Sequence, residues 1–265
     1  MPSIQDNLDC YDRSYDWSRS GEEWSRYFGG TELMWTWTIL PRISSYLPVE
    51  NMLEIAPGFG RVTQFLAPSA RNLTVVDLSN RCIEACKNRF AEYEHITYAV
   101  NDGRSLNMIE DGSVDFVFSW DSMVHVEADV IEAYLNQLAV KLRPGGVGFI
   151  HHSNLNMYSD PRRGASTLLQ EHRRAHSMSA TRFRGLCKRA GLSCRVQELL
   201  PWAGAPALLD CVSVFRREAG IGKILCRTTK VIKNHRFVEQ IETRPAVEIR
   251  KIAKMYQLPS LNSVN

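Results

Sequence analysis

The stretch NMLEIAPGFGRVTQFLAPSARNLTVVD, residues 51–77, decides the fold of this chain. The apolar run 52–56 predicts a buried strand, and the glycine turn 57–60 leads from it into an amphipathic helix. A second apolar run, 73–76, predicts another strand and ends on Asp77. Strand, glycine turn, helix, strand and acid form the opening βαβ unit of a nucleotide-binding α/β fold.

The charges of this unit restrict its ligand. A dinucleotide fingerprint has a third glycine three residues after Gly60, and Thr63 stands there instead. Glu54 lies inside the first strand, where it would repel a pyrophosphate and attract a cation. Asp77 can accept hydrogen bonds from the 2′- and 3′-hydroxyls of a ribose. The sequence therefore favours a positively charged nucleoside without phosphate.

Two segments of this unit resemble the class I S-adenosylmethionine-dependent methyltransferases. LEIAPGFG at 53–60 is similar to motif I of that family, usually E/D-x-G-x-G-x-G, with Ala56 in place of the first glycine. VVDLS at 75–79 is similar to its acidic loop, and KLRPGG at 141–146 to the turn before its fifth strand. The resemblance covers roughly residues 50–215 and implies an α/β, Rossmann-like, doubly wound sheet of seven strands. A Rossmann-like domain without this cofactor is the alternative.

S-adenosyl-L-methionine is the cofactor that the resemblance implies. In the family, an acid after the third strand accepts a hydrogen bond from the adenine amino group. Asp102 stands at that position, although it also suits an ordinary turn. The residues expected to contact the cofactor are Glu54, Ala56, Gly58, Gly60, Arg61, Asp77, Leu78, Asp102, Gly103 and Trp120.

Three regions follow from the placement of these motifs. Residues 1–50, rich in tryptophan and tyrosine, are expected to form an N-terminal helical lid. Residues 51–215 are expected to form the cofactor-binding core, with a substrate-side insertion at 155–177. Residues 216–265 carry a charge of +7, which leaves −4 on the rest of the chain. We expect them to form a basic helical extension, with a helix over 222–240. This extension is expected to form a contact between copies in a homo-oligomer, to dock to an acidic partner, or to be solvated.

The composition is that of a cytoplasmic globular protein. The chain has 265 residues, 44% of them hydrophobic and 23% charged, which suffices for a full core. No apolar run reaches the roughly 18 residues of a membrane span, and the N-terminus lacks a secretory signal pattern. The seven cysteines are scattered and odd in number, which indicates reduced thiols.

Candidate catalytic residues follow the fourth and fifth expected strands: Asp121 and His125 after the fourth, His151 and His152 at the end of the fifth. The carboxyl ends of the strands face the ligand crevice in a doubly wound sheet. A hydroxyl needs a general base because its pKa is high, and a neutral imidazole can serve near neutral pH. Alternation sends His151 and His152 to opposite faces. We expect one of the three histidines to be the base, and favour His152 over His151 because it lies further out of the sheet.

The segments SWDSMVHVE at 119–127 and GGVGFIHHSN at 145–154 resemble bacterial saccharide O-methyltransferases, some of which require Mg²⁺. This resemblance implies methylation of a hydroxyl on a small polar acceptor, a saccharide or glycoside, as in polysaccharide biosynthesis. Asp121 and His152 are the metal ligands that the sequence offers, although histidine is a poor ligand for Mg²⁺. The residues expected to contact the acceptor are Trp24, Tyr27, Arg173 and His176.

Other functions remain open on the sequence. The acceptor can be a phenolic or amine natural product, because an amine needs less activation than a hydroxyl. The fold can also serve as a scaffold without catalysis. The basic C-terminal region suggests RNA methylation, but no basic–aromatic interleaving or separate RNA-binding motif accompanies it. Nucleic acid is therefore not expected as a partner.

Overall fold

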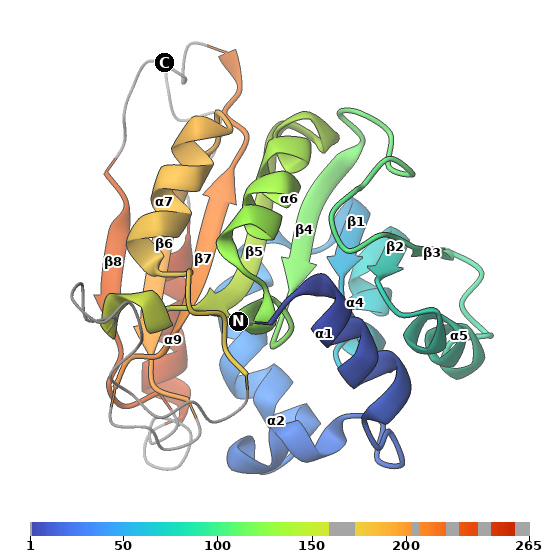
Figure 1. The fold of residues 1–265 in the computed structure, drawn as a ribbon. Helices are drawn as coiled ribbons and strands as arrows, with labels where there is room; N and C mark the ends of the chain where they lie inside the picture. The colour runs from blue at the N-terminus through green and yellow to red at the C-terminus, as the bar shows by residue number, and fades with distance from the viewer. Residues whose placement is uncertain (1, 159–172, 203–206, 221–227, 238–244, 258–265) are drawn as a thin grey trace.

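A computed structural model describes residues 2–158, 173–202, 207–220, 228–237 and 245–257, with the backbone alone for 245–250. Eight strands form one sheet, and helices cover both of its faces (Figure 1). The strands are β1 Val49–Ile55, β2 Ala70–Asp77, β3 Ile96–Val100, β4 Val114–Ser119, β5 Leu142–Ser153, β6 Ser193–Leu200, β7 Asp210–Arg216 and β8 Lys230–Lys233.

The sheet has the order β3-β2-β1-β4-β5-β7-β6-β8. The pairs among β1 to β5 are parallel, and β7 runs antiparallel to both β5 and β6. This topology confirms the predicted Rossmann-like α/β fold. From β1 to β3 the strands are added towards one edge of the sheet, and from β4 to β5 towards the other edge. The carboxyl ends of β1 and β4, between which this change of direction occurs, therefore open a crevice, the usual ligand position in such folds.

The prediction of seven strands is wrong by one. Val196–Leu199 of β6 pairs in parallel with Lys230–Lys233, which makes β8 an eighth, edge strand. Residues 230–233 lie within the helix that was predicted over 222–240, and that prediction is wrong for them because they form a strand. The segment KVIK carries two β-branched residues between lysines, a composition that suits a partly exposed edge strand.

The helices differ in length and type. The α-helices are α1 Ile4–Leu8, α2 Thr31–Met34, α3 Leu40–Ile43, α4 Thr63–Leu66, α5 Asn80–Arg89, α6 Ala128–Lys141, α7 Ala180–Arg189 and α9 Pro245–Tyr256. The short 3₁₀ and π segments are η1 Asp9–Ser14, η2 Glu22–Phe28, η3 Trp35–Ile39, η4 Ser44–Tyr46, η5 Ala67–Ser69, η6 Met123–His125 and η7 Leu155–Tyr158. Within the N-terminal region that was predicted to be helical, residues 31–46 form a continuous run of such segments.

Two apolar clusters hold the helices against the sheet. On one face, α6 and α7 bury Leu135 and Phe183 against strand residues such as Leu53. On the other face, η2, α2, η3, α3, α5 and α9 pack on strand residues such as Met52. Neighbouring residues of β1 thus face opposite layers, as strand alternation requires.

The C-terminal region contributes to the second cluster. Arg42 and Glu198 form a buried ion pair, with two nitrogen–oxygen distances of 2.7 Å. The Tyr256 hydroxyl of α9 donates to the same carboxylate, and Asn234 donates to it at 2.7 Å. Phe237 is buried as well. Side chains beyond residue 230 therefore complete the core on β6, because they satisfy a charge that is removed from water.

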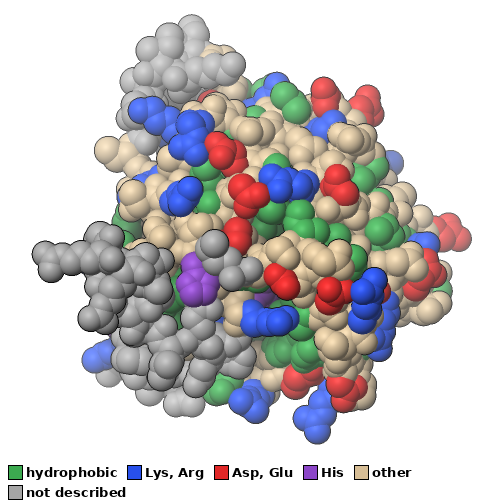
Figure 2. Space-filling view, in the orientation of Figure 1, with side chains coloured by type: hydrophobic (Ala, Val, Ile, Leu, Met, Phe, Trp, Pro, Cys, Tyr) green, Lys and Arg blue, Asp and Glu red, His purple; other side chains and the backbone are tan. Residues whose placement is uncertain are grey.

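The outer surface has a mixed charge. On the face shown in Figure 2, acidic and basic side chains are interspersed. Within the described residues, no helix is long and apolar enough to cross a membrane. The six cysteines that the structure describes are free thiols, and five of them are buried.

Candidate functional site

A cavity of about 440 Å³ lies at the carboxyl ends of β1, β2 and β4. Its floor comes from the loops that follow these strands, and its wall comes largely from residues 2–27 of the N-terminal segment. Most of the residues predicted to contact a cofactor line this cavity. They are Glu54, Ala56, Gly58, Arg61, Asp77, Leu78, Gly103 and Trp120.

The glycine turn has the left-handed backbone that its sequence predicts. The φ angles are +58° at Ala56, +60° at Gly58 and +78° at Gly60. A Cβ at Gly60 would lie 2.4 Å from the ring of Phe90, so α5 could not pack there with a larger residue. At Gly58 a Cβ would lie 3.0 Å from Trp17, which shows that the N-terminal segment reaches the turn. Gly60 supports the turn from behind and is absent from the cavity wall.

Asp77 ends β2 with its carboxylate at the cavity. It accepts hydrogen bonds from the backbone amides of Ser79 at 2.8 Å and Gly58 at 3.2 Å. Burial raises the pKa of Asp77 to about 6, against the lowering effect of these amides. The carboxylate is thus held by the glycine turn and can accept the hydroxyls of a ribose.

Glu54 lies beside it on β1 and is also buried. Its carboxyl accepts a hydrogen bond from the Thr63 hydroxyl at 2.7 Å. Burial raises the pKa of Glu54 to about 8. The side chain therefore holds a proton near neutral pH in the ligand-free protein, and a bound cation would favour its ionised form.

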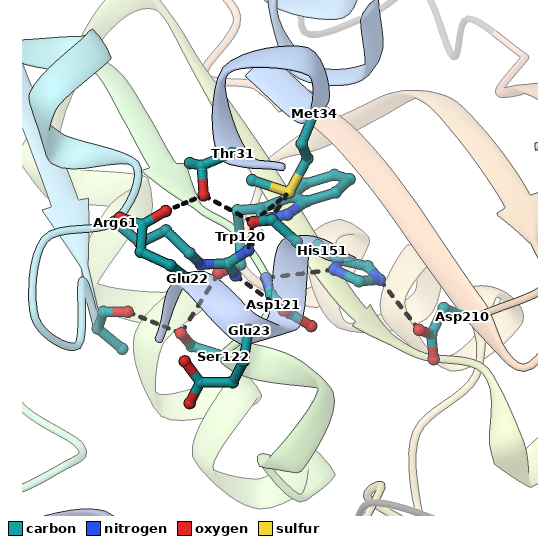
Figure 3. A network of polar contacts seen from close by, with 12 residues as sticks. Glu22, Glu23, Thr31, Met34, Arg61, Trp120, Asp121, Ser122, His151 and Asp210 are labelled. Atoms are coloured by element: carbon teal, nitrogen blue, oxygen red, sulfur yellow. Dashed lines mark hydrogen bonds and ion pairs between the residues drawn. The ribbon is translucent and has the colours of Figure 1, made fainter. Parts of the chain in front are cut away.

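Arg61 and Asp121 form an ion pair across the crevice, with Nη2 2.8 Å from Oδ2 (Figure 3). The same guanidinium donates to the hydroxyl of Ser25 at 2.6 Å and lies 5.5 Å from the ring centroid of Trp24. Asp121 has a left-handed backbone, with φ of +61°. The pair links the glycine turn, the loop after β4 and the N-terminal segment.

The prediction for Asp102 is not supported by its place in the structure. This side chain is exposed and lies outside the cavity wall, where it accepts hydrogen bonds from the amides of Arg104 at 2.8 Å and Ser105 at 2.6 Å. These bonds lower the pKa of Asp102. It forms the turn that its sequence also suited, and Gly103 lines the cavity in its place.

Among the three candidate histidines, His125 lines the cavity. Its Nδ1 lies 3.2 Å from the carbonyl oxygen of Arg173. A carbonyl can only accept, so Nδ1 carries the proton and Nε2 has a free lone pair in the neutral ring. Burial lowers the pKa of His125, which keeps the ring neutral.

His151 lies behind the wall and positions the loop that carries Asp121. It is fully buried. Its Nδ1 accepts a hydrogen bond from the amide of Asp121 at 3.2 Å, so Nε2 carries the proton and faces Asp210 Oδ2 at 3.2 Å. Asp210 also accepts two bonds from Arg174, at 2.6 and 2.7 Å. Burial alone would raise the pKa of Asp210, but Arg174 and His151 lower it below its usual range.

The preference for His152 as the base is wrong. Alternation on β5 points it to the α7 layer, where its ring stacks on Phe183 with centroids 4.3 Å apart. Its Nδ1 donates to the carbonyl of Ser153 at 2.9 Å, and its Nε2 accepts from Ser213 at 2.8 Å. Burial lowers the pKa of His152 to about 4. Both nitrogens are occupied, and the residue is absent from the cavity wall.

The predicted Mg²⁺ ligands do not come together. Asp121 pairs with Arg61 on one face of the sheet, whereas His152 bonds Ser213 on the other. Within the described ranges, no group of three or more His, Cys, Asp or Glu side chains has the arrangement of a metal site. Asp121 and His152 therefore do not form a site for Mg²⁺.

Of the residues predicted to contact the acceptor, Trp24, Tyr27 and Arg173 line the cavity, and His176 does not. The backbone amide of His176 donates to Glu127 at 3.2 Å. Residues 159–172 of the expected insertion lie outside the described residues.

Several residues of the wall were not predicted from the sequence, among them Tyr11, Tyr15, Glu23, Arg174 and Trp202. Tyr11 and Tyr15 are one helical turn apart, a spacing that could have marked them as neighbours. Their rings are 6.0 Å apart, and the ring of Tyr11 is 5.6 Å from that of His125.

Comparisons with known proteins identify a methyltransferase domain in this chain. Residues 52–146 match a family described as a methyltransferase domain. Phosphoethanolamine N-methyltransferase 1 of Triticum aestivum is 30% identical over 128 residues, which cover 46% of this chain and 26% of that protein. Nodulation protein S of Sinorhizobium fredii is 29% identical over 100 residues, 37% of this chain and 45% of that protein. The matches thus span less than half the length of these curated relatives.

Solved structures share the fold. The N-methyltransferase NodS from Bradyrhizobium japonicum, in complex with S-adenosyl-L-homocysteine, superposes with a TM-score of 0.53 at 21% identity, over 80% of this chain and 95% of that one. An S-adenosylmethionine-dependent methyltransferase from Clostridium acetobutylicum gives 0.53 at 14% identity, over 80% and 96%. Together with the motif on β1 and β2, these findings identify a methyltransferase domain at residues 52–146, on a fold shared with S-adenosylmethionine-dependent methyltransferases, and they support S-adenosyl-L-methionine as the cofactor of that domain.

Proposed function

We propose that this chain transfers a methyl group to a hydroxyl of a small polar acceptor, such as a saccharide or glycoside, with His125 as the proton acceptor. The observation that carries the proposal is the neutral His125 ring in the cavity wall, fixed through Nδ1 by the Arg173 carbonyl. S-adenosylmethionine supplies a methyl group on a positively charged sulfur, which needs an aligned nucleophile rather than further activation.

The chain's own residues would hold the cofactor at the glycine turn. Asp77 is placed for the ribose hydroxyls, and the backbone of Gly58 permits close approach. The Arg61–Asp121 pair offers one charge of each sign to an amino-acid moiety. Leu78 and Gly103 line the end of the cavity beyond Asp77, where a flat purine ring would fit.

The acceptor would bind between the N-terminal segment and His125. We propose that residues 1–50 act as a lid, because the rings of Tyr11, Trp17 and Trp24 line the cavity opposite the strand ends. A lid of this kind excludes water, which would otherwise solvate the reacting charges. Tyr11 contributes a hydroxyl next to His125, and burial raises the pKa of that hydroxyl above its usual range, so it stays protonated as a hydrogen-bond donor.

Proton transfer would follow a short path. The acceptor hydroxyl would give its proton to Nε2 of His125 as the new oxygen–carbon bond forms and the methyl–sulfur bond breaks, with S-adenosyl-L-homocysteine as the leaving group. The imidazolium would be stabilised by the Arg173 carbonyl at Nδ1 and by the nearby charge of Asp121. Because the ring is neutral before the reaction, its lone pair is available at neutral pH.

Methylation of an amine is a second candidate. It is favoured by the names of two relatives, an N-methyltransferase acting on phosphoethanolamine and the N-methyltransferase NodS. The same His125 would then remove a proton from an ammonium group.

The test is an acceptor screen with S-adenosylmethionine that carries carbon-13 in its methyl group. The panel contains neutral sugars, amino sugars, phenols and phosphoethanolamine, and the chemical shift of the product methyl distinguishes oxygen from nitrogen. We expect O-methyl products, with kcat reduced about 10²–10⁴-fold in His125→Ala. His95→Ala is the matched control. His95 lies outside the cavity wall, and its Nε2 is 3.0 Å from the carbonyl oxygen of Ala67. Products methylated only on nitrogen, or full turnover by His125→Ala, would overturn the proposal.

A further inference from the structure

Glu23 of η2 has an unsatisfied carboxylate oxygen in the cavity wall. Its Oε1 accepts a hydrogen bond from the Tyr15 hydroxyl. Its Oε2 is buried and has no hydrogen-bond partner within the part of the chain that the structure describes. A buried carboxylate oxygen without a donor is costly, and such atoms are rare in folded proteins. Because Glu23 lines the cavity, a bound ligand can provide the missing donor.

Aromatic rings adjoin Tyr15, whose hydroxyl donates to this carboxylate. The ring of Tyr15 lies 4.9 Å from that of Trp17 and 5.0 Å from that of Trp24, and the two tryptophans are 5.3 Å apart. All three line the same cavity as Glu23. Aromatic faces attract cations, and a carboxylate among them adds a full negative charge. We call Tyr15, Trp17, Glu23 and Trp24 the N-terminal acidic cluster.

Other carboxylates of the cavity are already engaged. Asp121 pairs with Arg61 at 2.8 Å, and Asp77 accepts two backbone amides. Glu127 accepts the amide of Ser177 at 2.9 Å. Glu23 differs from them in having a buried oxygen that no hydrogen bond from the described residues satisfies.

We propose that the N-terminal acidic cluster is a subsite for a protonated amine of the acceptor. The proposal rests on the function proposed above and narrows its substrate to a molecule with both an ammonium group and the hydroxyl that is methylated, such as an amino sugar or an amino alcohol. Tyr11 connects the two ends of this subsite, because its ring lies 6.0 Å from that of Tyr15 and 5.6 Å from that of His125. The ammonium binds at Glu23, and the hydroxyl binds at His125.

The cofactor also carries an ammonium group, so the experiment must separate the two sources. The full chain is saturated with S-adenosyl-L-homocysteine, which fills the cofactor's ammonium position. Methylammonium chloride is then titrated while tryptophan fluorescence is recorded, with methanol as the neutral probe of similar size and sodium chloride to hold ionic strength. We expect a saturable change with methylammonium and none with methanol.

Three variants sharpen the test. Glu23→Gln keeps the shape and removes the charge, and should weaken methylammonium binding about tenfold or more. Tyr15→Phe removes the donor to Oε1 and should bind methylammonium at least as tightly as the unaltered chain. Glu32→Gln is the matched control, because Glu32 is exposed on α2 and lies outside the cavity wall. Calorimetry should give the same affinity for S-adenosyl-L-homocysteine in Glu23→Gln, which also shows that the variant is folded.

The outcomes are distinct. Equal methylammonium binding in Glu23→Gln, or no saturable binding to the unaltered chain, overturns the subsite. A tenfold loss of S-adenosyl-L-homocysteine affinity in Glu23→Gln overturns it too, by assigning the carboxylate to the cofactor. The methylammonium experiment measures binding and no turnover. Failure of the hydroxyl mechanism in the acceptor screen would therefore leave the binding result unchanged, and failure of the subsite would leave the result of the screen unchanged.

Discussion

His151 on β5 accepts a hydrogen bond through Nδ1 from the backbone amide of Asp121, in the loop after β4, at 3.2 Å (Figure 3). The bond supports a residue whose φ of +61° is unfavourable for a side chain other than glycine. Asp210 fixes the opposite nitrogen of the ring. A fully buried imidazole thus holds the loop from which Asp121 and Ser122 face the cavity.

The two neighbouring histidines of β5 should respond differently to truncation. His151→Ala releases the Asp121 loop and should weaken binding of S-adenosyl-L-homocysteine about tenfold. His152→Ala leaves a cavity beside Phe183 and should lower the free energy of unfolding by about 2–4 kcal/mol with unchanged binding. Calorimetry and urea unfolding measure the two effects. Equal losses of binding in both variants would contradict the assignment of His151 to the loop.

Cofactor affinity should fall in mild acid because of Asp77. Burial raises the pKa of Asp77 to about 6, so the carboxyl takes up a proton as the pH falls through that value and loses its charge as a hydrogen-bond acceptor. The affinity for S-adenosyl-L-homocysteine, measured by calorimetry, should therefore drop between about pH 7 and pH 5. Asp77→Asn should bind more weakly at neutral pH and lose this dependence. A variant with the same pH profile as the unaltered chain would show that another group titrates.

Stability without cofactor should decline as the pH rises, because of Glu54. Burial raises the pKa of Glu54 from 4.5 to about 8, so between these values the folded state binds a proton that the unfolded state releases. The free energy of unfolding then falls with rising pH across this window, by about 1.4 kcal/mol for each unit of pKa difference. Glu54→Gln should flatten the profile in urea unfolding. Glu50→Gln, an exposed change on β1, is the control and should leave the slope intact.

The buried Arg42–Glu198 pair should be essential for the fold. Glu198→Gln leaves the guanidinium of Arg42 without a charged partner and should cost about 3–5 kcal/mol of unfolding free energy. Glu132→Gln breaks the exposed contact with Arg189, at 3.0 Å, and should cost less than about 1 kcal/mol. Urea unfolding compares the two. Equally small losses of unfolding free energy in Glu198→Gln and Glu132→Gln would mean that water reaches Arg42 and Glu198 through the C-terminal region.

The sequence by itself determined the first βαβ unit of the sheet and the glycine turn of the site. Apolar runs of strand length, a glycine turn and a terminal acid are local features, so their spacing already predicted β1, β2 and the position of Asp77. The left-handed turn at Gly58 and Gly60 follows from residue type, because glycine adopts that backbone without strain.

Only the tertiary structure decided which polar side chains face the cavity. Alternation predicted that His151 and His152 diverge, but the direction of each depends on which layer covers which face of β5. The tautomer of His125 is set by the carbonyl of Arg173, 48 residues distant in the sequence. The position of Arg61 is set by Asp121, 60 residues distant in the sequence. The edge strand β8 and the free oxygen of Glu23 likewise depend on partners distant in sequence. Local spacing fixes backbone period and turn geometry, whereas the protonation and partners of a buried side chain are set by groups that only the folded chain brings together.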